Sequence, residues 1–94
     1  MSVLKIMSLP EKFDFNYYEQ FLKEADEFFS NGSFSSIELD FSLVNYLDSS
    51  ALGMVIMLHK KAKAMNIKTS IKGANVMPAK ILMIAHLDRF YAFN

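Results

Sequence analysis

Two hydrophobic periods alternate along this chain, one typical of strands and one typical of helices. Residues 3–9 mix apolar and polar positions as a short strand does, and Pro10 removes a backbone donor where that strand should end. Residues 37–41 and 67–72 alternate apolar and polar side chains with a period of two, which predicts two further strands. Residues 90–93 suit a short last strand.

The clearest amphipathic helix is predicted between the first two strands. Asn16 and Glu19 resemble a capping box, and the helix should end near Ser30, because Asn31 and Gly32 tolerate the left-handed conformation of a helix end. The apolar residues at spacings of three and four are Tyr18, Phe21, Leu22, Ala25, Phe28 and Phe29.

Two more helices are predicted after the second and third strands. One begins at Ser49 and Ser50, is apolar nearly all round from residue 51 to 58 except at Gly53, and continues to Met65 with a basic second half. The other follows a turn at residues 73–75 and has Pro78 in an early turn. The order of elements predicts right-handed crossovers and an α/β open sandwich with a mostly parallel four-stranded sheet and about three helices. We expect residues 1–94 to form one domain.

Composition narrows the class of protein further. Of the 94 residues 52% are hydrophobic, which provides a core without a disulfide, and there is no cysteine. No apolar run approaches the roughly 20 residues that span a bilayer, so we expect a cytoplasmic protein with no direct membrane insertion, either a monomer or a weak dimer. Lysine and arginine balance aspartate and glutamate at ten each, which argues against nucleic acid as a partner.

The charges are divided unevenly between the two halves of the chain. Residues 1–48 hold nine acidic residues against three lysines, whereas residues 49–94 hold seven basic residues against Asp88 alone. The halves therefore carry formal charges of −6 and +6. The simplest interpretation is that these charges lie on solvated faces, and that the halves partly neutralise each other in the folded chain.

The sequence lacks the arrangements that catalysis and cofactor binding require. His59 and His86 are the only imidazoles, and no serine lies in a G-x-S-x-G elbow. There is no cluster of metal ligands, and Gly32, Gly53 and Gly73 are scattered singly rather than forming a phosphate-binding loop. We predict a protein that is not an enzyme and needs no cofactor and no metal; an esterase built on Ser49 with either histidine ranks last.

One motif is specific enough to indicate a family. The stretch Asp48-Ser49-Ser50-Ala51-Leu52-Gly53 follows an apolar segment and opens the second helix. With the strand at 37–41 and the helix to Met65, it closely resembles the D-S-S-G-L-G signature of STAS domains, which include the bacterial anti-sigma factor antagonists. More loosely, Phe13-Asp14 resembles the turn before the family's first helix, and residues 76–87 resemble its third helix.

The resemblance implies a role in signal transduction and transcription regulation. In that family the serine after the aspartate is phosphorylated by a partner kinase that is also the anti-sigma factor, and this role maps onto Ser49. The resemblance thus implies a protein that binds a serine kinase of the anti-sigma type, is released by phosphorylation of Ser49, and is reset by a phosphatase. The predicted partner-binding residues are Asp14, Asp48, Ser50, Leu52, Met54 and Met57.

Two interpretations of this motif remain beside the phosphoswitch. STAS domains also serve in membrane transport complexes, so a constitutive subunit of such a complex is the alternative. Under the resemblance, Ser50 would be the local helix cap or a supporting hydroxyl. On composition alone, residues 48–53 would be an ordinary helix cap with spare serines, and the methionines would fill gaps in the core. The chain departs from the family pattern at Ala51, where glycine is usual. We also expect no counterpart in it of the first of the family's two N-terminal strands or of the family's last helix.

Overall fold

The computed structural model describes residues 3–30 and 34–94. The predicted helix-ending roles of Asn31 and Gly32 lie outside the described residues. The predicted stop near Ser30 is confirmed, because α1 spans Tyr18–Ser30.

Four parallel strands form the central sheet, in the order β1-β3-β5-β6. Their bounds are Leu4–Ser8 for β1, Ser36–Asp40 for β3, Lys68–Lys72 for β5 and Ala92–Phe93 for β6. Each strand pairs with the next one in parallel register, so that Ile6 lies opposite Glu38 and Glu38 opposite Ser70. The four predicted strands and their parallel arrangement are confirmed.

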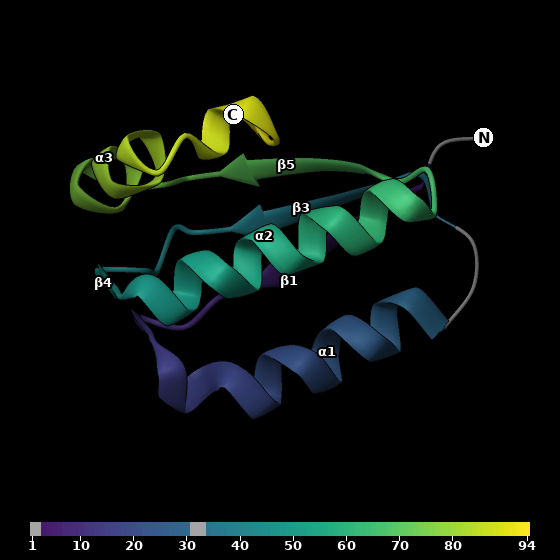
Figure 1. Cartoon of the computed structure of the whole chain (residues 1–94), viewed down its shortest axis with the longest axis horizontal. Coiled ribbons are helices and arrows are strands. Elements are labelled where there is room, and N and C mark those ends of the chain that lie inside the picture. Colours follow the sequence, from purple (N-terminus) through teal and green to yellow (C-terminus); the bar gives the residue numbers. More distant parts are fainter. Residues whose placement is uncertain (1–2, 31–33) are drawn as a thin grey trace.

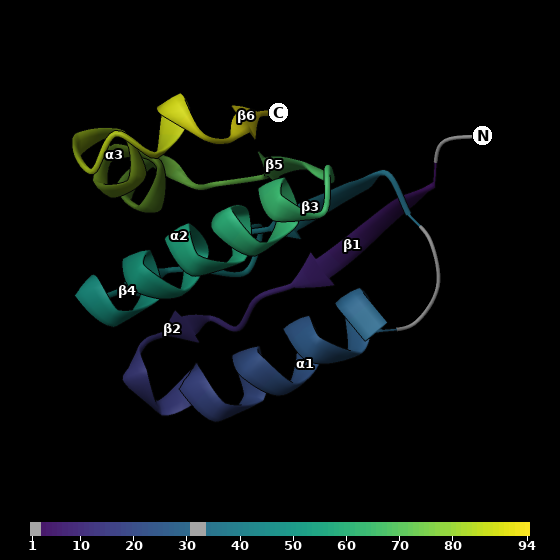
Figure 2. The same cartoon turned by 45° about the vertical axis from the view of Figure 1, so that its right-hand side comes forward.

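All three helices lie on the same face of this sheet. Successive strands step in one direction across it, and right-handed crossovers then place every connecting segment on one side. Figures 1 and 2 show α1 and α2 (Ser49–Ala64) side by side in front of the sheet, with α3 (Val76–Ile84) beyond them near the end of β5. The other face carries the even-numbered strand residues, among them Leu4 and Ile6, which remain about half exposed.

The core fills the space between the sheet and the helices. Odd-numbered strand residues point into it, as the alternation at residues 37–41 predicts. Its largest fully buried side chains are Phe13, Phe21, Phe41, Met7, Leu9, Ile37, Leu39, Met54, Leu58, Ile71, Leu82 and Leu87. Tyr91, from the segment before β6, is also buried and donates a hydrogen bond to the Val55 carbonyl at 2.8 Å, which attaches the C-terminal segment to α2.

The predicted turn at residues 73–75 positions the start of α3. Gly73 has φ +71°, a conformation that side chains disfavour, and a Cβ atom there would lie 3.2 Å from the Ser42 Cβ. Asn75 precedes α3 and donates hydrogen bonds to the carbonyls of Ser42 and Val44. The turn therefore connects α3 to the loop that follows β3.

Candidate functional site

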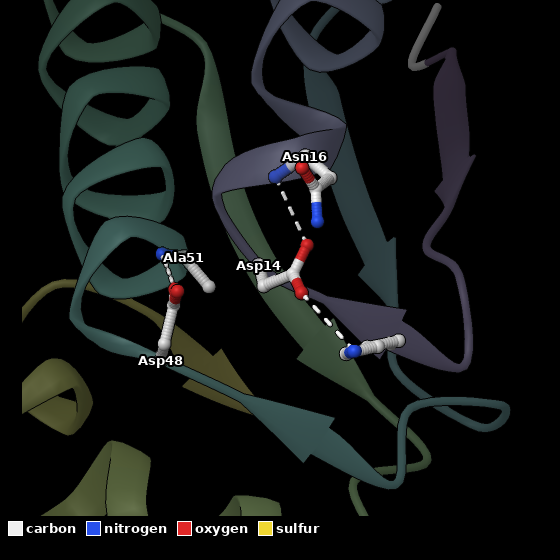
Figure 3. A network of polar contacts seen from close by, with 5 residues as sticks. Asp14, Asn16, Asp48 and Ala51 are labelled. Carbon is white, nitrogen blue, oxygen red and sulfur yellow. Dashed lines mark hydrogen bonds and ion pairs between the residues drawn. The ribbon is translucent and has the colours of Figure 1, made fainter.

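Two short parallel strands bring two helix N-termini together. β2 (Lys12–Phe13) pairs with β4 (Tyr46–Leu47), with Phe13 opposite Leu47. Asp14 follows Phe13 and Asp48 follows Leu47, so the two aspartates leave the paired strands at the same level. Figure 3 shows both carboxylates at this edge, each beside the first turn of a helix.

Asp48 is the residue that caps α2. It has an extended backbone, and its carboxylate accepts a hydrogen bond from the Ala51 N–H at 3.0 Å. Ser49 is therefore the first residue of the helix, and its side chain is exposed. The prediction that α2 begins at the serines is confirmed. Of the two roles predicted for Ser50, that of helix cap is wrong, because the Asp48 carboxylate already accepts the free backbone N–H, and that of a supporting hydroxyl stays a prediction.

Asp14 plays the equivalent part at the other helix. Its carboxylate accepts a hydrogen bond from the Asn16 N–H at 3.0 Å and caps a 3-10 turn, Phe15–Tyr17, that runs directly into α1. The predicted capping box at Asn16 is wrong, because the cap lies two residues earlier. Asp14 is only 8% exposed, and the Lys12 ammonium lies 3.9 Å from its second oxygen.

The orientation of α2 decides which of its apolar residues a partner could reach. Ser49, Gly53 and Met57, spaced four apart, lie on its exposed side. Leu52 is half-buried against the core. The opposite side packs against the sheet through Ala51, Met54, Val55, Leu58 and Ala62.

Met54 is the predicted contact residue that this orientation buries. Its side chain is 1% exposed and belongs to the core, so the prediction that it stands exposed for a partner is wrong. Ala51 stands where the STAS signature has glycine. It is fully buried and belongs to the same core.

An aromatic pair completes the exposed surface beside Ser49. Phe15 is 67% exposed and stacks on Tyr18, with ring centroids 6.1 Å apart. The two rings form one wall of a shallow groove of about 290 Å³, and Ser50, Gly53 and Met57 form the other. We call this the α2 groove and define it by Phe15, Tyr18, Ser50, Gly53 and Met57, with Met54 at its floor.

Hydrophobic periodicity does not predict this aromatic pair, because it places Tyr18 on the apolar face of α1. The three-residue spacing of Phe15 and Tyr18 was the available signal, because it places both rings on one side of a helical turn. Phe15 precedes the α-helix itself, so the periodic set did not include it.

Gly53 leaves the middle of the groove open. It lies inside a helix, where glycine is unfavourable relative to alanine, yet a Cβ atom built on it would meet no heavy atom within 4 Å. Packing within the described residues therefore does not require glycine at this position. Its lack of a side chain leaves this wall of the groove open between Ser50 and Met57.

His59 is too far from Ser49 to accept the proton of its hydroxyl, as a catalytic base in hydrolysis would. Ten residues along an α-helix correspond to about 15 Å, so His59 lies well beyond hydrogen-bonding distance of Ser49. Its Nδ1 is instead 2.9 Å from the Thr69 hydroxyl, which donates to the Phe90 carbonyl. His59 therefore links α2 to β5 and the C-terminal segment.

Comparison with known families assigns the chain to one of them. The family model described as STAS domain matches residues 2–93, and the chain belongs to this family. The fold and the family predicted from the motif at residues 48–53 are confirmed.

Solved structures share this fold at low sequence identity. The anti-sigma factor antagonist SpoIIAA in its unphosphorylated form matches with a TM-score of 0.81 at 19% identity, over 100% of this chain and 82% of that one. The phosphorylated form of SpoIIAA, a Bacillus cell fate determinant, matches at 0.74 and 17%, over 100% and 85%. The STAS domain of a SulP transporter from Vibrio cholerae matches at 0.82 and 16%, over 97% and 73%. The fold is thus equally similar to an antagonist and to a transporter domain.

Among the described residues, none of the helices combines the length and the apolar character needed to cross a bilayer.

Proposed function

We propose that this protein is a phosphoswitch of the anti-sigma factor antagonist type. Unmodified, it binds a serine kinase of the anti-sigma class through Ser49 and the α2 groove; phosphorylation of Ser49 releases the kinase, and a phosphatase restores binding. The observation that carries the proposal is the exposed Ser49 at the first position of α2, next in sequence to Ser50, which lines an apolar groove.

The surroundings of Ser49 suit a kinase substrate. The Asp48 carboxylate caps the helix, so modification of the Ser49 hydroxyl would not remove a capping hydrogen bond. A phosphoryl group would lie at the N-terminal end of α2, where the helix dipole stabilises negative charge by about 0.3–1 kcal/mol. The domain can therefore accept the modification without losing its own helix.

The same charge opposes a bound partner. Phosphorylation adds roughly −1.5 to −2 charges next to the carboxylate of Asp48 and near that of Asp14. Burying such a group under a partner without a cation to pair with it costs several kcal/mol, and each 1.4 kcal/mol reduces affinity about tenfold. Aromatic and methionine side chains in the groove would lose their contacts together with the serine.

Affinity capture from the native cell tests the proposal. Wild-type and Ser49→Ala protein should retain a serine kinase of the anti-sigma type, identified by mass spectrometry, and Ser49→Asp should lose it. Ser30→Asp adds the same charge at the far end of α1 and should retain the kinase. Equal recovery of the kinase with Ser49→Asp would contradict the mechanism.

A constitutive subunit of a membrane transport complex is the second candidate, favoured by the similarity to the SulP domain. In that role the α2 groove would contact its partner permanently and Ser49 would stay unmodified. Mass spectrometry of protein purified from growing cells distinguishes the switch from the subunit. A Ser49 peptide that is heavier by one phosphoryl group, about 80 Da, supports the switch. Capture of a transporter with Ser49 bare in all conditions supports the subunit.

A further inference from the structure

The sheet has one long edge that no other strand covers in the described part of the chain. β1 lies at the end of the strand order and is five residues long, whereas β6 at the opposite end has only two residues. Short edges are protected from pairing with other chains, and long ones present a row of unpaired backbone groups. β1 is therefore the edge able to accept another strand.

The unpaired backbone groups of β1 belong to its even-numbered residues. In a parallel pair, alternate residues bond the neighbouring strand with both N–H and C=O. Val3 accepts from the Ser36 N–H and Leu9 donates to the Asp40 carbonyl, so the odd-numbered residues face β3. Leu4, Ile6 and Ser8 consequently direct their N–H and C=O groups away from the sheet.

A groove runs along this edge on the helix side. It has a volume of about 440 Å³ and lies between β1 and the outer side of α1. Its lining residues are Lys5, Ile6, Met7, Ser8, Glu24, Glu27 and Phe28. Glu24 accepts hydrogen bonds from Tyr17 at 2.9 Å and Gln20 at 3.1 Å, whereas Glu27 has no hydrogen bond or ion pair to any described residue.

These features specify the chemistry of a strand that would pair here. Its side chains would alternate between the two faces of the sheet. On the open face they would meet the exposed Leu4 and Ile6, which favours apolar residues. On the helix side they would meet Phe28 and the carboxylates of Glu24 and Glu27, which favours arginine or lysine with an aliphatic stem.

A second copy of this chain fits the edge less well. Antiparallel β1 strands would be related by a twofold axis perpendicular to the sheet, so both α1 helices would lie on the same face. Glu24 and Glu27 from each copy would then flank the seam, against one Lys5 from each copy. Four carboxylates against two ammonium groups disfavour that pairing.

We infer that the free edge of β1 is a second docking site, which binds an extended segment of a partner protein with alternating apolar and basic side chains. The segment adds a fifth strand beside Leu4, Ile6 and Ser8, and its basic side chains contact Glu24 and Glu27. This site is separate from the α2 groove and does not depend on the state of Ser49.

Amide hydrogen exchange by NMR tests the inference on the whole protein. The probe is a blocked nine-residue peptide of alternating valine and arginine. Its binding should slow exchange at the amides of Leu4, Ile6 and Ser8, which have no partner on β3, and leave Lys5 and Met7 as they are. The matched peptide with glutamate in place of arginine should bind at least tenfold more weakly, because it meets the acidic side of α1.

Two variants locate the contact. Glu27→Gln should weaken binding of the arginine peptide about threefold, while Glu19→Gln, on the same helix but outside the groove, should leave it unchanged. Ile6→Pro removes an outward-facing N–H, not one that bonds β3, together with the apolar side chain on the open face, and should abolish binding.

Three results would overturn the inference: equal binding of the two peptides, protection at residues outside β1, or concentration-dependent protection of β1 without peptide, which would identify a second copy as the occupant. Ser49→Asp should bind the arginine peptide like wild type, so failure at this edge and failure of the phosphoswitch are distinguishable.

Discussion

Asp14 and Asp48 each cap the first turn of a helix. Their carboxylate oxygens therefore fix the positions of the first residues of those helices. Both carboxylates accept a backbone N–H at 3.0 Å, and the parallel pairing of β2 with β4 places them at the same level. Ser49 depends on Asp48 for its place at the helix start. In the proposed switch, the aspartates therefore position the site, and the exposed side chains beside them contact the partner.

Removal of the Asp48 cap should lower stability, and a neutral replacement should restore most of it. Asp48→Ala leaves the Ala51 N–H without its acceptor and is expected to reduce the free energy of unfolding by about 1 kcal/mol. Asp48→Asn keeps an oxygen acceptor and should lose much less. Urea denaturation measures both, and equal losses in the two variants would show that the negative charge, rather than the hydrogen bond, supports the helix.

Gly53→Ala separates stability from binding. The Cβ enters open space, and alanine is favoured over glycine inside a helix, so the free energy of unfolding should rise by about 0.5–1 kcal/mol. If a partner packs against the groove floor, its affinity should fall at the same time. Urea denaturation and affinity capture measure the two effects, and a more stable variant with unchanged binding would remove Gly53 from the contact surface.

At the scale of elements, the sequence predicted the three α-helices and the four strands of the central sheet in the described part of the chain. The helices and the three longer strands show their period, and β6 lies within the aromatic segment 90–93. β2 and β4 were missed because two residues carry no period and no such segment marks them. Met54 was misplaced because residues 51–58 are apolar nearly all round, which hides the side of α2 that faces the core. The exposed side of α2 is marked in the sequence only by Ser49, Gly53 and the lysines of its second half.

The pairing of the two aspartates could not be predicted from the motif at 48–53 alone. Their neighbourhood depends on the β2–β4 register, a contact between residues 34 positions apart in sequence. The aromatic wall of the α2 groove depends on it as well, because Phe15 and Tyr18 follow Asp14 directly. The motif thus identified one half of the site, and the fold supplied the other half.

His59 makes the link between α2 and β5 sensitive to pH. Burial, and then the charge of Lys63, lower the pKa of His59 below its usual 6.5. The unfolded chain therefore binds this proton more readily, so stability should fall as the pH decreases below about 6.5 and should not change through this group above it. Urea denaturation at about pH 7.5 and pH 5.5 should show a smaller decrease in His59→Gln than in wild type.

At the scale of the whole molecule, the two halves of opposite charge meet at the helix layer. Lys61 of α2 lies 3.2 Å from Asp26 of α1 and 5.6 Å from the Phe29 ring centroid. Both charged side chains are at least half exposed, so the pair contributes little to stability. The charge asymmetry therefore shapes the surface, with an acidic α1 along the β1 edge and a basic second half of α2.

The phosphoswitch proposal requires that modification change this surface while the fold persists. Ser49→Asp places a carboxylate at the N-terminal end of α2, where the dipole favours it by about 0.3–1 kcal/mol, and next to Asp48, which repels it. These effects oppose each other, so the free energy of unfolding should stay within about 1 kcal/mol of wild type. Urea denaturation followed by circular dichroism measures it, and Ser30→Asp, at the negative end of α1, should be the less stable of the two variants. A loss above about 2 kcal/mol in Ser49→Asp would mean that phosphorylation acts by unfolding the domain, and release of the partner would then need no repulsion at the α2 groove.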